Sequence, residues 1–310
     1  WSSDVCSSDL AKAALDAIEA LAQSASSPEG RAEQYLRAAK LLVESGDLDG
    51  AIERFKLALD ANPQDPQLSI ELRRAYVARG DVNAAIQLLE RDLERTEGER
   101  AKAKLAGEIA LLAHRNLKND AKAEDAAKRA LALDPTNIDG LLVMGDLAFE
   151  GERFLEASRY YSSLADRAEA LDREIATEML IRYVDALARN GSTERALAAM
   201  DTLLRIAPDN QQAVLRVAQV TYEAGTPERS IELHEQLLRH FATELADRDR
   251  ARVLHRYGDS LRKVGRFAEA IARLEESVDL DPTVTAPLTA LANVYADQGH
   301  RHKKLSRIGH

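Results

Sequence analysis

The feature that most constrains this chain of 310 residues is a glycine followed five residues later by a small residue. The pairs are Gly46/Ala51, Gly80/Ala85, Gly191/Ala196, Gly225/Ser230 and Gly265/Ala270. The steps from Gly46 to Gly80 and from Gly191 to Gly225 are both 34 residues long. Glycine ends a helix in the left-handed conformation without a steric cost, and a small residue lets two helix backbones cross closely. The pattern therefore predicts helix pairs, each joined by a glycine turn and repeated along the chain.

A proline marks the end of each predicted pair. It stands twelve residues after the small residue in Ala51/Pro63, Ala123/Pro135, Ala196/Pro208 and Ala270/Pro282. Because proline cannot continue a helix, it indicates where the chain leaves the second helix. This order of small residue and proline, at a step of 34 residues, resembles the tetratricopeptide repeat family. The resemblance implies an all-α fold, a right-handed superhelical solenoid of antiparallel helix pairs.

The repeat is expected to occupy most of the chain. The units would be residues 32–65, 66–99, 104–137, 138–171, 177–210, 211–244 and 251–284, with another beginning at 285. We therefore expect an array over residues 31–299, with about seven full repeats and the first helix of an eighth. Residues 11–30 would hold the remnant second helix of an earlier repeat. Extra residues around 97–102 and 242–250 are expected to lengthen the preceding second helix or the loop after it.

The two ends do not fit the repeat. Residues 1–10, WSSDVCSSDL, resemble a translated sequencing adapter and contain the only tryptophan and the only cysteine, which excludes an internal disulfide. Gly299 is expected to end the first helix of the eighth repeat, but Lys304 stands where a small residue is required. Residues 300–310 would form a polar, basic tail. We interpret the chain as a fragment of a longer bacterial protein with non-native residues at its start.

Composition and charge exclude several classes of function. The net charge of −10 argues against nucleic acid as a partner, because nucleic-acid-binding domains carry a clustered basic excess. No run of about 18 apolar residues is present, so no membrane span is expected. Cytoplasm is the default location. The periplasm and the cell exterior stay open, because a targeting signal would lie upstream of Trp1.

Two motifs are candidates for catalysis, and both are incomplete. His234 begins like the helix of a zinc protease, but Leu238 stands where the second histidine ligand is required. Ser260 and Lys263 match the four-residue nucleophile motif of penicillin-binding enzymes, yet its companion motifs are missing. The alternative for His234 is a surface histidine on a second helix, and the spacing of a repeat helix already explains Ser260 and Lys263. The sequence therefore predicts no catalytic, metal or cofactor site, and no enzyme.

The resemblance directs attention to one face of the array. In the tetratricopeptide family the first helices line a concave groove that binds segments of partner proteins. Projected onto this chain, an apolar row would contain Leu36, Ile70, Leu142, Ile181 and Leu215. A polar row beside it would contain Lys40, Arg74, Asp146, Asp185, Gln219, Asp259 and Asn293. Phe149 and Tyr222 would lie one helical turn further along. We expect these residues to bind the partner.

The polar row changes from basic to acidic along the chain. A partner segment with apolar side chains, and with basic residues toward the C-terminal units, would be complementary to it. The alternative is that the apolar row packs between neighbouring first helices and the charges are merely solvated.

The leading hypothesis is a protein–protein interaction scaffold or adaptor that holds a partner segment in the concave groove. One alternative is a regulatory or substrate-recruiting arm of a larger enzyme, such as a kinase or a transferase, whose catalytic domain lies outside this sequence. Another is a structural role through self-assembly of the array ends. The sequence leaves the partner's identity and the oligomeric state open.

Overall fold

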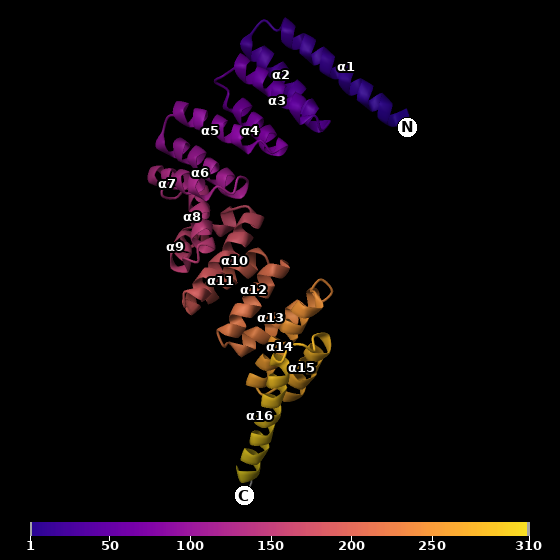
Figure 1. Ribbon diagram of the computed structural model, residues 1–310, viewed down its shortest axis with the longest axis vertical. Helices are drawn as coiled ribbons and strands as arrows, with labels where there is room; N and C mark the ends of the chain where they lie inside the picture. The colour runs from indigo at the N-terminus through magenta and orange to yellow at the C-terminus, as the bar shows by residue number, and fades with distance from the viewer. Residues whose placement is uncertain (1, 309–310) are drawn as a thin grey trace. The chain divides into compact units, whose positions relative to one another are not determined.

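The computed structural model is a succession of helices (Figure 1). It describes the backbone of residues 2–308 and the side chains of residues 12–299. No strand occurs in the described backbone, so the expected all-α repeat is confirmed. The helices are α1 (Ser2–Ser24), α2 (Pro28–Glu44), α3 (Leu48–Ala61), α4 (Pro66–Arg79), α5 (Val82–Arg95), α6 (Glu99–Arg115), α7 (Asp120–Leu133), α8 (Ile138–Glu150), α9 (Phe154–Ala165), the 3-10 turn η1 (Ala168–Ala170), α10 (Arg173–Arg189), α11 (Thr193–Ile206), α12 (Gln211–Glu223), α13 (Pro227–His240), α14 (Asp247–Lys263), α15 (Phe267–Leu280) and α16 (Ala286–Ile308).

The chain divides into two compact units, residues 1–147 and residues 148–310. In the first unit each helix from α1 to α7 contacts the next. In the second unit each helix from α9 to α16 contacts the next, and the first helices α10, α12, α14 and α16 also contact one another in sequence. The first helices of the second unit therefore form one continuous layer.

Each helix pair is joined through one residue in the left-handed region, which we call the turn residue. Five turn residues are the expected glycines, at 46, 80, 191, 225 and 265, with φ between 72° and 87°. The other two are Lys118, with φ of 52°, and Glu152, with φ of 57°. The sequence pattern did not reveal these two turns because neither has glycine at the left-handed position.

The residue five positions after each turn residue is fully buried. This holds for all seven positions: Ala51, Ala85, Ala123, Ala157, Ala196, Ser230 and Ala270. The crossing of α14 and α15 shows why. A Cβ atom added to Gly258 would lie 2.6 Å from Cγ of Leu274 and 3.2 Å from the carbonyl oxygen of Ala270. The two helices are thus too close for a larger side chain at either position.

The prolines end the second helices as predicted. Pro63, Pro135, Pro208 and Pro282 each stand two residues beyond the last residue of α3, α7, α11 and α15. Several helices begin with a capping side chain. Asp47, Asp81 and Asn119 accept hydrogen bonds from backbone N–H groups three residues ahead, at 2.9, 3.2 and 3.1 Å. These contacts satisfy N–H groups that the first turn of a helix leaves without a partner.

The expected effect of the extra residues on the second helices was wrong. The second helices before them, α5 and α13, keep the 14 residues of an ordinary unit. Instead the first helices that follow, α6 and α14, are 17 residues long, whereas α4 has 14 and α12 has 13. Part of the second insertion, residues 241–246, forms the loop that was expected. The rest lengthens the next first helix at its N-terminus.

The two ends of the array differ in how they follow the prediction. Helix α1 packs through Leu15 against the core of α2 and α3, and Glu19 pairs with Arg54 at 2.6 Å. At the other end, the turn expected at Gly299 is absent, because α16 continues to Ile308. The sequence after Gly299 has no apolar stripe that could dock as a second helix. The side chains of residues 1–10 and 300–310 lie outside the described part, so their assignments stay predictions.

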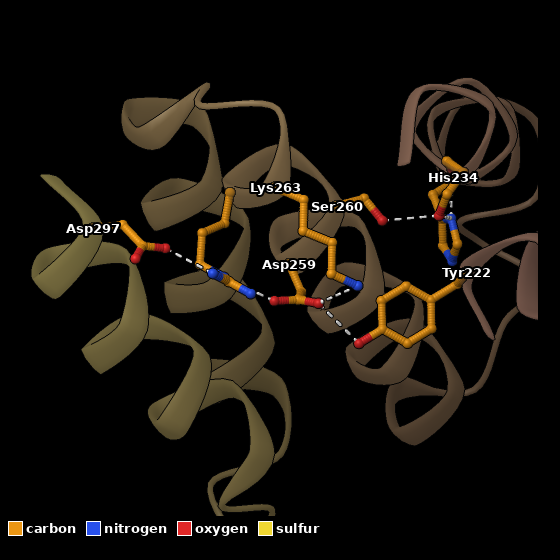
Figure 2. A network of polar contacts seen from close by, with 8 residues as sticks. Tyr222, His234, Asp259, Ser260, Lys263 and Asp297 are labelled. Carbon is orange, nitrogen blue, oxygen red and sulfur yellow. Dashed lines mark hydrogen bonds and ion pairs between the residues drawn. The ribbon is translucent and has the colours of Figure 1, made fainter. Parts of the chain in front are cut away.

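The crossing of α13 and α14 contains a buried polar cluster (Figure 2). Nδ1 of His234 donates to the carbonyl oxygen of Ser230 at 2.6 Å, and the hydroxyls of Ser230 and Ser260 are 2.9 Å apart. His234 is only 1% exposed, so its interpretation as a surface histidine was wrong. Burial lowers the pKa of His234 to about 4, although the Ser230 carbonyl acts in the opposite direction. The imidazole is therefore neutral in the folded chain across the physiological range.

Replacement of either non-glycine turn residue by glycine should stabilise the fold. We expect Lys118→Gly and Glu152→Gly each to raise the free energy of unfolding by roughly 0.5–1 kcal/mol, because a left-handed backbone costs a residue with a side chain about 1–2 kcal/mol. Urea denaturation checks this. Gly46→Ala is the matched control and should lower stability by a similar amount. A loss of stability in both glycine variants would show that the turns are not strained.

Acid should destabilise the chain through His234. The unfolded side chain titrates near 6.5 and the folded one near 4, so protons bind preferentially to the unfolded state as the pH falls through this window. From this group alone, stability should be about 2 kcal/mol lower at pH 5 than at pH 7.5. Denaturation of the chain and of His234→Gln at both pH values isolates the contribution. Equal pH dependence in the two proteins would contradict it.

Candidate partner-binding surface

The turn residues give every first helix the same register. In five repeats, the residue of the predicted apolar row stands ten residues before the turn residue. The residue of the polar row stands six residues before the turn residue. In the apolar row Leu142 is buried, whereas Leu36, Ile70, Ile181 and Leu215 are half-buried. The same register position holds Glu108 on α6 and His255 on α14. The apolar row is therefore interrupted by a polar residue in each compact unit.

The aspartates of the polar row are too buried to form a binding surface. Asp146, Asp185 and Asp259 are 5%, 7% and 8% exposed, whereas Lys40, Arg74 and Asn293 are exposed. Gln219 is half-buried and donates to Glu223 on its own helix at 2.9 Å. The row therefore offers a partner its basic and neutral members, but little surface of its aspartates.

The buried aspartates contact residues of neighbouring helices. In the first unit Oδ2 of Asp146 lies 3.9 Å from Nε2 of His114 on α6. In the second unit Asp185 on α10 forms an ion pair with Arg216 on α12. Burial raises the pKa of Asp185, although Arg216 beside it acts in the opposite direction. A charge reversal at Asp185 would place two cations together and would test the fold before it tests binding.

Asp259 is the centre of a larger network on α12, α14 and α16 (Figure 2). Its carboxylate accepts a hydrogen bond from Tyr222 at 3.0 Å, and pairs with Arg262 at 3.0 Å and Lys263 at 3.1 Å. Arg262 also reaches Asp297 on α16 at 2.7 Å. Burial opposes ionisation of Asp259, but the hydrogen bonds from Lys263 and Arg262 hold its pKa below the ordinary value. This carboxylate is ionised and fully engaged.

The predicted aromatic residues take part in contacts within the second unit. Phe149 packs edge-to-face on Phe154 with 5.6 Å between ring centroids. The Tyr222 ring lies 4.6 Å from Nζ of Lys263. Burial and the nearby Asp259 raise the pKa of Tyr222 to about 12, so its hydroxyl stays protonated and can donate to that carboxylate. Both aromatic residues are half-buried and contribute some open surface.

Sequence reasoning missed a row of arginines nine residues before the turn residue. Arg182, Arg216 and Arg256 occupy this position on α10, α12 and α14. Each reaches back to the preceding first helix. Arg182 is 3.9 Å from Glu150, Arg216 pairs with Asp185, and the guanidinium of Arg256 lies 6.0 Å from the Tyr222 ring centroid. The spacing of 34 and 40 residues could have revealed this row once the turn residues were aligned.

A groove in the second unit contains one member of the predicted apolar row, Ile181. It has a volume of about 890 Å³ and lies between α10 and the loop from α11 to α12. Its lining includes Thr177, Glu178, Ile181, Arg182 and Gln212. Ile181 of the apolar row therefore stands in a depression wide enough for side chains of another chain.

A second groove lies in the first unit. Its volume is about 1040 Å³, and its lining includes Ile70, Arg73, Tyr76 and Arg91. Arg73 is 7% exposed and pairs with Asp92 at 2.9 Å, whereas the predicted Arg74 is exposed and lies 3.6 Å from Glu71. The groove therefore contains one member of the apolar row, together with a buried arginine that the sequence reasoning had not selected.

The candidate catalytic residues contact other residues of the repeat helices. The hydroxyl of Ser260 contacts Ser230, whereas the amine of Lys263 contacts Asp259, so the two do not form a nucleophile and its base. Within residues 12–299, no group of three or more His, Cys, Asp and Glu side chains could hold a metal ion. In the same part of the chain, no helix is long and apolar enough to cross a membrane.

Comparison with known proteins identifies relatives over most of the chain. Tetratricopeptide repeat profiles match residues 42–107, 142–211 and 210–283. DnaJ homolog subfamily C member 3 of Bos taurus is 23% identical over 281 residues, which cover 81% of this chain and 52% of that protein. Protein CTR9 homolog of Arabidopsis thaliana is 22% identical over 284 residues, covering 86% and 24%. The chain therefore spans about half and about a quarter of these relatives.

A solved structure shows the same architecture, and a second is similar in part. The C-terminal part of a TPR repeat-containing protein from Cytophaga hutchinsonii superimposes with a TM-score of 0.55 at 16% identity, covering 83% of this chain and 99% of that one. A tetratricopeptide repeat protein from Parabacteroides merdae gives a TM-score of 0.49 at 15% identity, covering 85% and 98%. The three profile matches extend over more than half of the residues and agree with the seven turns and buried crossings. The chain belongs to the tetratricopeptide repeat family.

Proposed function

We propose that this chain is a protein-interaction scaffold that holds a segment of a partner protein against the first helices α10, α12, α14 and α16. Family membership supports the scaffold role. The observation that supports this face in particular is the shared register, which places half-buried Ile181, Leu215 and Tyr222 on consecutive first helices that contact one another. On this face, partly exposed apolar side chains lie beside polar groups that already have partners within the fold. Such a surface can bind an extended or helical segment.

The groove beside Ile181 is a depression in this face. It is lined by polar and apolar side chains from α10 and from the loop before α12. A partner side chain that enters it would contact Ile181 and leave its own backbone near Gln212 and Leu215. Such a central apolar anchor with a polar rim is the arrangement that carries most of the binding free energy in protein interfaces.

A role as the regulatory or substrate-recruiting arm of a larger enzyme stays open as an alternative. Both named relatives are longer than this chain. The binding face would have the same function in either case. The expected cytoplasmic location, the bacterial origin and the absence of an enzymatic activity stay predictions.

Loss of an apolar side chain from this face should weaken binding of peptides selected against the purified chain. Peptides of twelve random residues would be selected by phage display and their dissociation constants measured by fluorescence anisotropy. We expect Leu215→Ser to weaken the selected peptides by about tenfold, which corresponds to about 1.4 kcal/mol and to the loss of one buried leucine contact.

The matched control is Leu155→Ser. Leu155 is 57% exposed and lies on α9, a second helix of the same unit. Circular dichroism confirms the folding of both variants. If Leu155→Ser weakens the selected peptides and Leu215→Ser does not, the partner binds on the second helices and the proposed face is wrong.

A further inference from the structure

The charge of α14 departs from that of the whole chain. Six cations and three aspartates lie between Asp247 and Lys263, whereas the chain as a whole carries a net charge of −10. Three of these cations have carboxylate partners close by. Arg252 contacts Asp249 at 3.1 Å, Arg262 contacts Asp259 and Asp297, and Lys263 contacts Asp259. The helix thus carries a net positive charge, which its own aspartates and Asp297 on α16 offset in part.

Arg256, like Arg248 and Arg250 on the same helix, has no carboxylate partner among the described side chains. Within the described side chains, no hydrogen bond or ion pair reaches its guanidinium, which lies against the Tyr222 ring. The equivalent arginines on α10 and α12 differ in this respect, because Arg182 pairs with Glu178 at 3.0 Å and Arg216 pairs with Asp185. Arg256 therefore keeps its hydrogen-bond donors open.

The surroundings of Arg256 disfavour a charged guanidinium that has no carboxylate partner. The residue is half-buried, and burial lowers the pKa of Arg256, as do the charges of Arg252 and Arg216. Glu223 and Tyr222 act in the opposite direction. Glu223 accepts a hydrogen bond from Gln219 and forms none with Arg256. An added carboxylate would relieve both the lost hydration and the repulsion among the three arginines.

His255 extends this site along the apolar row. It stands at the register position held by Ile181 and Leu215 on the preceding first helices. Burial lowers the pKa of His255, with Arg256 and Lys263 adding to the effect and Asp259 opposing it. The neutral imidazole can donate one hydrogen bond and accept another. The row therefore changes from apolar to hydrogen-bonding where the arginines gather.

We propose that the partner segment is acidic where it crosses α12 and α14, and that one of its carboxylates pairs with Arg256 between Arg216 and Arg252. This inference rests on the proposed function. A planar guanidinium binds a carboxylate through two parallel hydrogen bonds, which no solvent molecule reproduces. Apolar side chains of the same segment would lie on Leu215 and Tyr222. The charge is opposite to the one expected from the polar row, because the aspartates of that row are engaged within the fold.

Three fluorescein-labelled peptides of fourteen residues test the charge. Each alternates leucine pairs with pairs of glutamate, glutamine or lysine. Anisotropy titrations at low salt should show the glutamate peptide binding at least about tenfold more tightly than the glutamine peptide, with the lysine peptide weakest. Arg256→Gln should weaken the glutamate peptide by about tenfold, the size expected of one hydrogen-bonded ion pair.

The matched control is Arg239→Gln on α13, where Arg239 is exposed and pairs with Glu235. This change should leave the affinity within about twofold, and thermal unfolding confirms that each variant folds. Arg256→Glu should abolish the preference for glutamate over glutamine. A short DNA duplex carries negative charge without apolar side chains. Binding of the duplex as tight as that of the glutamate peptide would overturn the assignment of a protein partner.

The experiment separates the two proposals. If the glutamine or lysine peptide binds best and Leu215→Ser weakens it, the face binds a partner but the inferred acidic character is wrong. Equal affinity of the glutamate peptide for the Arg256→Gln variant and the unchanged chain would also overturn the inference. If no peptide binds, or if Leu215→Ser and Arg256→Gln are both without effect, the proposed function fails together with it.

Discussion

The close crossing of each helix pair at a fully buried small residue is the constraint on which the rest of the structure depends. Seven such residues have no exposed surface, and a Cβ atom added to Gly258 would lie 2.6 Å from Cγ of Leu274 on the neighbouring helix. Because the crossing lies five residues after the turn residue, it fixes where each first helix must end. The register of every side chain on the first helices follows from that one position.

A common register brings equivalent residues of successive first helices together, and this determines which groups remain for a partner. Asp185 reaches Arg216, and Tyr222 reaches Asp259, across consecutive first helices. Buried carboxylates are costly unless cations and hydrogen-bond donors surround them, so these aspartates stabilise the stacking of units as long as their partners are in place. What the stacking leaves open is apolar surface at Ile181 and Leu215 and the guanidinium of Arg256.

The sequence predicts structural features that depend on residues close by in the chain. It does not predict the burial or pairing of a residue whose partner is distant in the sequence. Glycine turns, crossing residues and terminal prolines are local, so five turns and four helix ends were placed correctly. The turns at Lys118 and Glu152 were missed because a left-handed lysine or glutamate has no local signature. Asp185 and Asp259 were read as exposed because their burial depends on Arg216 and Tyr222, 31 and 37 residues away. Arg256 stands out only when its neighbours' partners are known.

We infer that the aspartates of the first-helix face form ion pairs and hydrogen bonds within the fold, and that the groups without such contacts bind the partner. A double-mutant cycle on Asp185→Asn and Arg216→Gln tests it most directly, with free energies of unfolding measured for the two single variants, the double variant and the unchanged chain. We expect a coupling energy of about 1 kcal/mol or more, since the two side chains form a largely buried ion pair between consecutive repeats. Additive effects, within about 0.3–0.5 kcal/mol, would contradict it and would return Asp185 to the set of residues available to a partner.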